Sequence, residues 1–194
     1  MNELLPLATY CLLMSSTPGP NNVMLTASGA NFGYRGTLPA ILGIVVGGAL
    51  QTYVTCLGLG ALFVAYPTLH TVLRVAGALY LLVLAWWLTG GAVGRSELPR
   101  PVSFTQAALF QAVNPKSWIK AVTLASVFTP VGFHPAAGAL LVSLIGLAIG
   151  LPCISMWALF GVAIGRFLGN ARRQRVFNAI MGGALAVLAL MLIR

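Results

Sequence analysis

Two short polar stretches interrupt long apolar runs and hold the residue types that could bind a small polar molecule. The first is Thr17-Pro18-Gly19-Pro20-Asn21-Asn22, and the second is Asn114-Pro115-Lys116. Proline lacks a backbone N–H and clashes with the preceding helical turn, so each stretch predicts a break in a helix. Thr17-Pro18 and Asn114-Pro115 each pair an N-cap residue with a proline at the first helical position. Each pair therefore predicts a helix start whose free N–H groups, carrying about half a positive charge, could hold a carboxylate.

Lys116 is the most distinctive of these residues, because it lies near the middle of an apolar stretch long enough to span a membrane. A charge at that depth costs from about 2.5 to above 10 kcal/mol on different scales, and it usually marks a functional site. The chain has only two carboxylates, Glu3 and Glu97, both near predicted membrane ends. We therefore expect the carboxylate of a bound molecule to be the counter-ion of Lys116. The three asparagines of the two stretches would hold other polar groups.

Lys120 lies one helical turn beyond Lys116 and on the same face. We expect its long side chain to extend toward the far membrane interface, where the ammonium group can reach water.

The composition predicts an integral membrane protein. Of 194 residues, 59% are hydrophobic and only 7% are charged, with a mean hydropathy of +0.94. A soluble domain of this size needs more polar surface. The net charge of +9 comes from arginines scattered between apolar runs, which indicates membrane orientation and not a nucleic-acid-binding face. The three cysteines match no metal or disulfide framework, and no cofactor is expected.

We predict an all-α fold in which six segments cross the lipid bilayer. A span needs about 20 residues, so the length leaves no room for a separate soluble domain. The first and fourth segments carry the two breaks, and Gly33-Tyr34-Arg35-Gly36 forms the turn after the first. The predicted segments are residues 3–32, 38–64, 71–90, 104–129, 136–163 and 176–193.

The two halves of the chain have matching features in the same order. Each has a broken segment, then a GxxxG segment (Gly43/Gly47 and Gly146/Gly150), then a segment with a Gly-Ala-Leu step. Glycines at this spacing permit close helix packing in membranes, which is the role we assign to them. Because three is an odd number of spans, the second half must enter the membrane the other way up, as in the inverted repeats of secondary carriers. We therefore divide the chain into a first repeat (1–92), a connection (93–103) and a second, inverted repeat (104–194).

The positively charged connections predict the orientation. Those after the first, third and fifth segments hold most of the arginines, and the positive-inside rule places them in the cytoplasm with both termini outside. If the first segment does not cross fully, the N-terminus lies inside. The arginines in these connections are Arg35, Arg95, Arg100, Arg166, Arg172, Arg173 and Arg175.

The successive motifs resemble those of the LysE/RhtB family of bacterial amino-acid exporters. The resemblance is carried by Thr17-Pro18-Gly19-Pro20-Asn21, Gly33-Tyr34-Arg35-Gly36, Gly77-Ala78-Leu79-Tyr80-Leu81 and Asn114-Pro115-Lys116, in order. It implies export of amino acids or close derivatives across the bacterial inner membrane, driven by the proton gradient. Lys120 departs from the phenylalanine-rich stretch usual after the motif lysine, so no particular amino acid is carried over.

We therefore expect a transporter and not an enzyme, working by alternating access on a small-molecule substrate within the lipid bilayer; a homo-oligomeric state stays open. The expected substrate-binding residues are those of the two breaks: Thr17, Pro18, Gly19, Pro20, Asn21, Asn22, Asn114, Pro115 and Lys116. The alternatives are an inorganic-cation permease, which should show membrane carboxylates or clustered Cys, His and Met, and a non-transporting membrane assembly subunit.

Overall fold

The computed structural model describes residues 4–59, 67–89, 100–130 and 132–193, and these ranges are helical with short connections. Four helical stretches within them are long and apolar enough to cross a membrane: Pro20–Leu59, Thr71–Leu88, Pro135–Phe167 and Ala171–Met191. The described chain is thus an all-α membrane protein. Its helices are α1 (Leu4–Ser16), α2 (Pro20–Val54), the π-helical turn η1 (Thr55–Leu59), α4 (Pro67–Leu88), α5 (Phe104–Val113), α6 (Pro115–Val127), α7 (Pro135–Phe167) and α8 (Ala171–Ile193).

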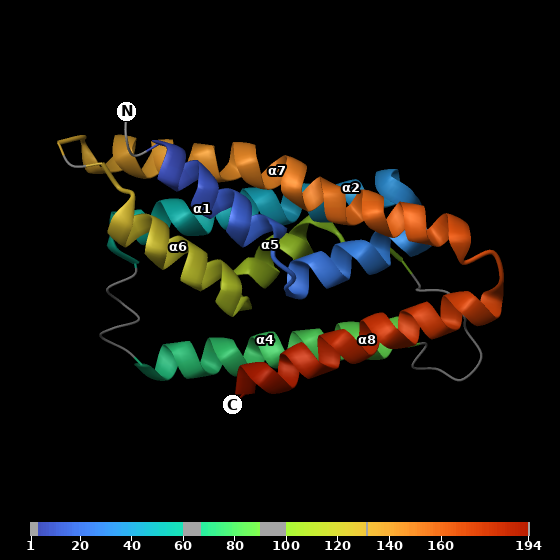
Figure 1. Cartoon of the computed structure of the whole chain (residues 1–194). Coiled ribbons are helices and arrows are strands. Elements are labelled where there is room, and N and C mark those ends of the chain that lie inside the picture. The colour runs from blue at the N-terminus through green and yellow to red at the C-terminus, as the bar shows by residue number, and fades with distance from the viewer. Residues whose placement is uncertain (1–3, 60–66, 90–99, 131, 194) are drawn as a thin grey trace.

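Helix α2 is folded back on itself at Gly33. The backbone there has φ 70° and ψ 176°, in the left-handed range that favours glycine. Ser28 Oγ lies 2.9 Å from Thr37 Oγ1, although nine residues of straight helix would separate them by roughly 13 Å. The predicted turn after the first segment is therefore confirmed. We call residues 20–32 the first arm of α2 and residues 34–54 its second arm, and Figure 1 shows the reversal between them.

Both predicted helix breaks are present. Helix α1 ends at Ser16 and α2 begins at Pro20, while α5 ends at Val113 and α6 begins at Pro115. In each case the proline occupies the first helical turn, where its missing N–H costs nothing. The apolar run 4–32 and the apolar run 104–127 thus each consist of two helices joined by a short break.

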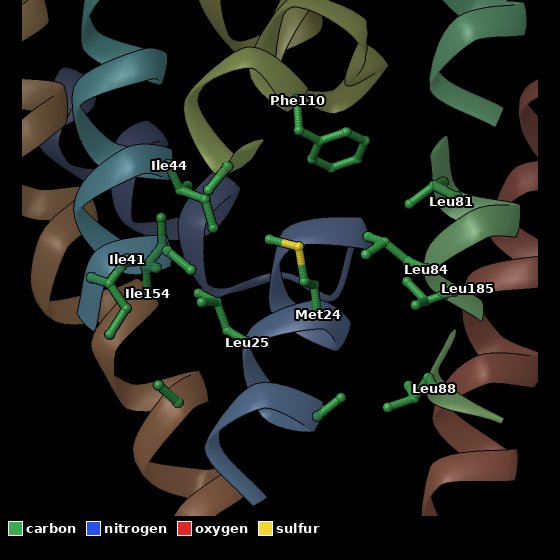
Figure 2. Close-up of a cluster of buried hydrophobic side chains, with 14 of the residues drawn as sticks. Met24, Leu25, Ile41, Ile44, Leu81, Leu84, Leu88, Phe110, Ile154 and Leu185 are labelled. Atoms are coloured by element: carbon green, nitrogen blue, oxygen red, sulfur yellow. The ribbon is translucent and has the colours of Figure 1, made fainter. Parts of the chain in front are cut away.

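The helices form two groups (Figure 1). Helix α2 packs mainly on α7 and α5, whereas α4 packs along α8 at the lower edge of the view. The main core joins the two groups: Met24 and Leu25 of α2 lie between Ile41 and Ile44 of its second arm and the leucines of α4, as Figure 2 shows. A smaller cluster joins α1, α6 and α7 through Leu7, Cys11, Leu124 and Val142.

The GxxxG pair of the first half packs as predicted. A β-carbon added at Gly43 would lie 2.3 Å from the backbone oxygen of Phe104, and one at Gly47 would lie 2.8 Å from that of Ala108. Only glycine permits this approach of α2 to α5, because both neighbours are backbone atoms.

The pair Gly146/Gly150 does not mediate close packing, and that prediction is wrong. A β-carbon at either position would approach no atom closer than 3.7 Å. The tight contacts of α7 lie further along, where a β-carbon at Gly161 would lie 2.1 Å from the oxygen of Thr26, and one at Gly165 would lie 2.7 Å from a backbone oxygen of α2. These two glycines have the same spacing, and the sequence analysis overlooked them because glycine is frequent throughout the chain.

Candidate functional site

The two helix breaks meet at Lys116. Its Nζ donates to the backbone oxygen of Thr17 at 2.5 Å, to Thr17 Oγ1 at 2.9 Å and to the backbone oxygen of Pro18 at 3.3 Å. The contact joins residues 99 positions apart along the chain. A side chain of the second break is therefore hydrogen-bonded directly to the first break.

Thr17 and Pro18 do not begin a helix, contrary to the sequence-based expectation. The N–H and the hydroxyl of Thr17 each donate to the oxygen of Leu13 at 2.9 Å, so Thr17 continues α1. Gly19 is the N-cap of α2, with extended backbone at φ −174° and ψ 179°, and Pro20 is the first helical residue. The reason is that a residue before proline is pushed into extended conformation, so the second proline of the stretch fixes the helix start.

Lys116 therefore faces the C-terminal end of α1. The last carbonyl groups of a helix are unpaired and carry about half a negative charge, so the break itself supplies partners for the ammonium group. Gly19 makes room for this side chain, since a β-carbon there would lie 2.9 Å from Lys116 Cδ and 3.2 Å from Nζ. In the described part of the chain the partners of Lys116 are thus carbonyl and hydroxyl oxygens, with no carboxylate among them.

Asn22 bridges the first break from the inside. Its side-chain amide is buried, and Nδ2 donates to the oxygen of Thr17 at 2.7 Å and to that of Ser15 at 3.3 Å. The Thr17 oxygen thus accepts from both Asn22 and Lys116. The C-terminal end of α1 is held by one amide and one ammonium group.

Asn114 is the N-cap of α6, as predicted. Its Oδ1 accepts from the N–H of Lys116 at 3.1 Å, and its backbone oxygen accepts from the N–H of Ser117 at 3.1 Å. Pro115 has no N–H to offer. The predicted set of free N–H groups is therefore largely used within the protein at this helix start.

A partly buried amide network that the sequence analysis missed links the two breaks. Asn21 Nδ2 donates to Gln111 Oε1 at 3.0 Å, and Gln111 Nε2 donates to Asn21 Oδ1 at 3.3 Å. Ser117 Oγ also donates to Gln111 Oε1, at 2.7 Å. The available signal was the placement of Gln111 within an apolar run, one helical turn before Asn114, since polar side chains inside a span usually have partners.

A small cavity of about 70 Å³, lined by both polar and apolar residues, lies between the breaks. Five of the predicted site residues line it: Gly19, Asn21, Asn22, Asn114 and Lys116. The other four, Thr17, Pro18, Pro20 and Pro115, shape the breaks without lining the cavity. The lining also includes polar residues that the sequence analysis did not select, namely Ser15, Thr52, Gln111, Ser117, Lys120 and Ser143.

Lys120 lines the same cavity, and the prediction that it extends to the membrane interface is wrong. Its Nζ donates to Ser15 Oγ at 3.3 Å. The glycine at position 150 leaves space in front of it, because a β-carbon there would lie 4.0 Å from Lys120 Nζ. Two ammonium groups on one face of α6 thus border the cavity. No group of three or more His, Cys, Asp or Glu side chains that could hold a metal ion occurs in the described part of the chain.

Two broken membrane helices whose breaks enclose a cavity are the arrangement from which secondary transporters build their substrate sites. The sequence matches the family of LysE type translocators over residues 12–194. The chain therefore belongs to the LysE type translocator family, and it is a membrane transporter and not an enzyme.

Curated relatives agree with this assignment. The chain is 30% identical over 168 residues, 86% of its own length and 86% of theirs, to the cysteine/O-acetylserine efflux proteins of Salmonella choleraesuis (strain SC-B67), Salmonella typhimurium (strain LT2) and Escherichia coli (strain K12). No solved structure matches the chain.

Proposed function

We propose that this protein exports amino acids or close derivatives from the bacterial cytoplasm across the inner membrane by alternating access. The observation that carries the proposal is the contact of Lys116 with the end of α1, beside a cavity lined by residues of both breaks. The efflux proteins among its relatives act on cysteine and O-acetylserine, which supports a small amino acid as the substrate.

The substrate carboxylate binds Lys116 in place of the carbonyl oxygens of Thr17 and Pro18. A carboxylate adds the attraction of a full negative charge to the hydrogen bond, which a neutral carbonyl oxygen cannot supply. Binding would therefore remove the hydrogen bonds of Lys116 to the end of α1 and leave that of Lys120 to Ser15 between α6 and α1. The amide groups of Asn21 and Asn22 then offer acceptors and donors to the remaining polar groups of the substrate, including its ammonium group.

This exchange of partners suggests how binding could be coupled to movement. With Lys116 on the end of α1, the two breaks are tied together; with Lys116 on the substrate, that tie is lost and only Asn22 still holds the Thr17 oxygen. A ligand shifts a conformational equilibrium only by binding the two states differently. The substrate would do so here because it competes for a contact that belongs to one state.

We further propose six spans arranged as inverted repeats, with residues 1–92 as the first repeat, 93–103 as the connection and 104–194 as the second. The reversal of α2 at Gly33 divides its 35 residues into two arms, which supports separate spans. The contacts between the halves correspond as such a repeat requires: the first arm of α2 packs on α7, the second arm packs on α5, and the equivalent helices α4 and α8 pack on each other. The arginine-rich connections would face the cytoplasm.

The proton gradient is the proposed energy source. Because Glu3 begins the first predicted span and Glu97 lies in the connection between the third and fourth spans, neither carboxylate lies deep in the membrane, and the coupled proton would be carried by a lysine or by the substrate itself.

Efflux from proteoliposomes tests the proposal. Vesicles loaded with a mixture of neutral amino acids and O-acetylserine should release some of them through the wild-type protein. Lys116→Met, which keeps the chain length and removes the charge, should abolish release while the protein still inserts and purifies normally. Lys116→Arg is the matched control, since it keeps the charge and alters the geometry, and it should retain partial release.

The rival functions predict different results. Release of inorganic cations without amino acids would indicate a cation permease, and release of neither would indicate a non-transporting subunit. Normal amino-acid release by Lys116→Met would contradict the role given to the lysine.

A further inference from the structure

Two lysine side chains line the cavity and, among the described residues that line it, no acidic side chain does. Lys116 and Lys120 are four residues apart on α6, a spacing that brings like charges together and is unfavourable in a helix. The other polar lining groups are neutral: the amides of Asn21, Asn22, Gln111 and Asn114, and the hydroxyls of serine and threonine.

We infer that Lys120 is a specificity-determining residue, which makes the cavity select small amino acids with neutral or acidic side chains and reject those with a cationic side chain. The inference rests on the proposed transport function and adds the substrate class to it. Lys116 would bind the carboxylate that every amino acid has, whereas Lys120 would face the variable part of the substrate.

The geometry assigns different tasks to the two lysines. Lys116 is held by three oxygen atoms at the first break, at 2.5, 2.9 and 3.3 Å. Lys120 has one hydrogen-bond partner in the described part of the chain, the hydroxyl of Ser15 at 3.3 Å. It lies one turn deeper along α6, near the space that Gly150 leaves open. An ammonium group with a single hydroxyl partner, facing a cavity, attracts an anionic group and repels a cationic one.

The size of the cavity supports a small substrate. Its volume of about 70 Å³ favours a substrate with a short side chain over one with a long side chain. If the ammonium group of Lys120 and a cationic substrate side chain are separated by about 7 Å, in an effective dielectric constant of about 20, their repulsion reduces relative transport by a factor of about ten or more.

The test compares two amino acids that differ in charge and hardly in shape, 2-aminopentanoate and 2,4-diaminobutyrate. Proteoliposomes are loaded with equal concentrations of both, and their release is measured by mass spectrometry. The wild-type protein should release 2-aminopentanoate about ten times faster or more. Lys120→Met should reduce this ratio toward one, and Lys120→Arg should preserve it. Arg172→Met is the matched control, because it removes the same charge from the exposed start of α8 and should leave the ratio unchanged.

The outcomes separate this inference from the proposed function. If the wild-type protein releases no amino acid, the proposed function fails. If it releases both compounds equally, or if Lys120→Met transports with the wild-type ratio, only the role of Lys120 fails. If Lys120→Met does not insert into membranes, Lys120→Gln takes its place under the same criteria, and the wild-type ratio alone can still overturn the inference.

Discussion

Replacing Gly19 by alanine should leave the fold intact but lower the rate of transport. The backbone at this residue is extended, with φ −174° and ψ 179°, a conformation that any residue adopts. The substitution Gly19→Ala therefore adds no backbone strain. Its new methyl group would lie 2.9 Å from Lys116 Cδ, which is about 0.6 to 1.1 Å closer than the optimal separation of two carbon atoms.

The lysine, being flexible, has to move by about that amount. The hydrogen bond of Lys116 Nζ to Thr17 Oγ1, now 2.9 Å, would then exceed the length at which a hydrogen bond is effective. Hydrogen bonds to charged groups contribute about 1.5 to 3 kcal/mol. If the position of Lys116 governs the transport cycle, the efflux rate should fall by about tenfold to a hundredfold, at 1.4 kcal/mol per factor of ten.

The assay is efflux from proteoliposomes at matched protein content, with thermal unfolding in detergent measured alongside. Gly183→Ala is the control: it also adds one methyl group, but a β-carbon there would meet no atom within 4 Å. Gly183→Ala should transport at the wild-type rate. If Gly19→Ala also transports at the wild-type rate, the position of Lys116 at the break has no part in transport and the reasoning is refuted.

Three further substitutions test the packing and the helix ends. Gly161→Val should prevent stable folding, because its β-carbon would lie 2.1 Å from the backbone oxygen of Thr26 and overpacking costs about 1 to 3 kcal/mol or more. Gly146→Val, with no close backbone neighbour, should melt near the wild-type temperature. Equal melting temperatures of the two variants would contradict this account of α7. Asn22→Ala leaves two carbonyl oxygens of the first break without their amide partner, so unfolding should become easier by about 1 to 3 kcal/mol, a loss that denaturant titration would detect. Ser103→Ala removes the capping box of α5 and should cost about 1 kcal/mol of stability with unchanged efflux; a loss of efflux at full stability would argue against a purely structural cap.

The sequence predicted the positions of the helix breaks because prolines and glycines act locally, although it placed the start of α2 at Pro18 and not at Pro20. Pro20 and Pro115 fix helix starts, and Gly33 fixes a reversal, through their own backbone geometry. Composition alone was sufficient for the membrane environment. The last part of the predicted second segment, residues 60–64, lies outside the described residues.

The candidate site was harder to predict because its contacts are long-range. Nothing in the local sequence indicates that Lys116 reaches the end of α1, nor that Gln111 pairs with Asn21 across 90 residues. Lys120 was misjudged for the same reason: a long side chain can point either way, and only the space beside Ser15 and Gly150 decides its direction.

The central claim is that substrate binds in the cavity between the two breaks and there engages Lys116. A cysteine placed at Gly48 tests it most directly, because Gly48 lines the cavity and a β-carbon there would meet no atom within 4 Å. The measurement is the rate at which a small thiol reagent modifies Gly48→Cys, in a protein whose native cysteines are replaced by alanine. We predict that a transported amino acid slows the reaction, and that it no longer does so when Lys116→Met is added. Equal rates with and without a substrate that the same protein transports would contradict the claim.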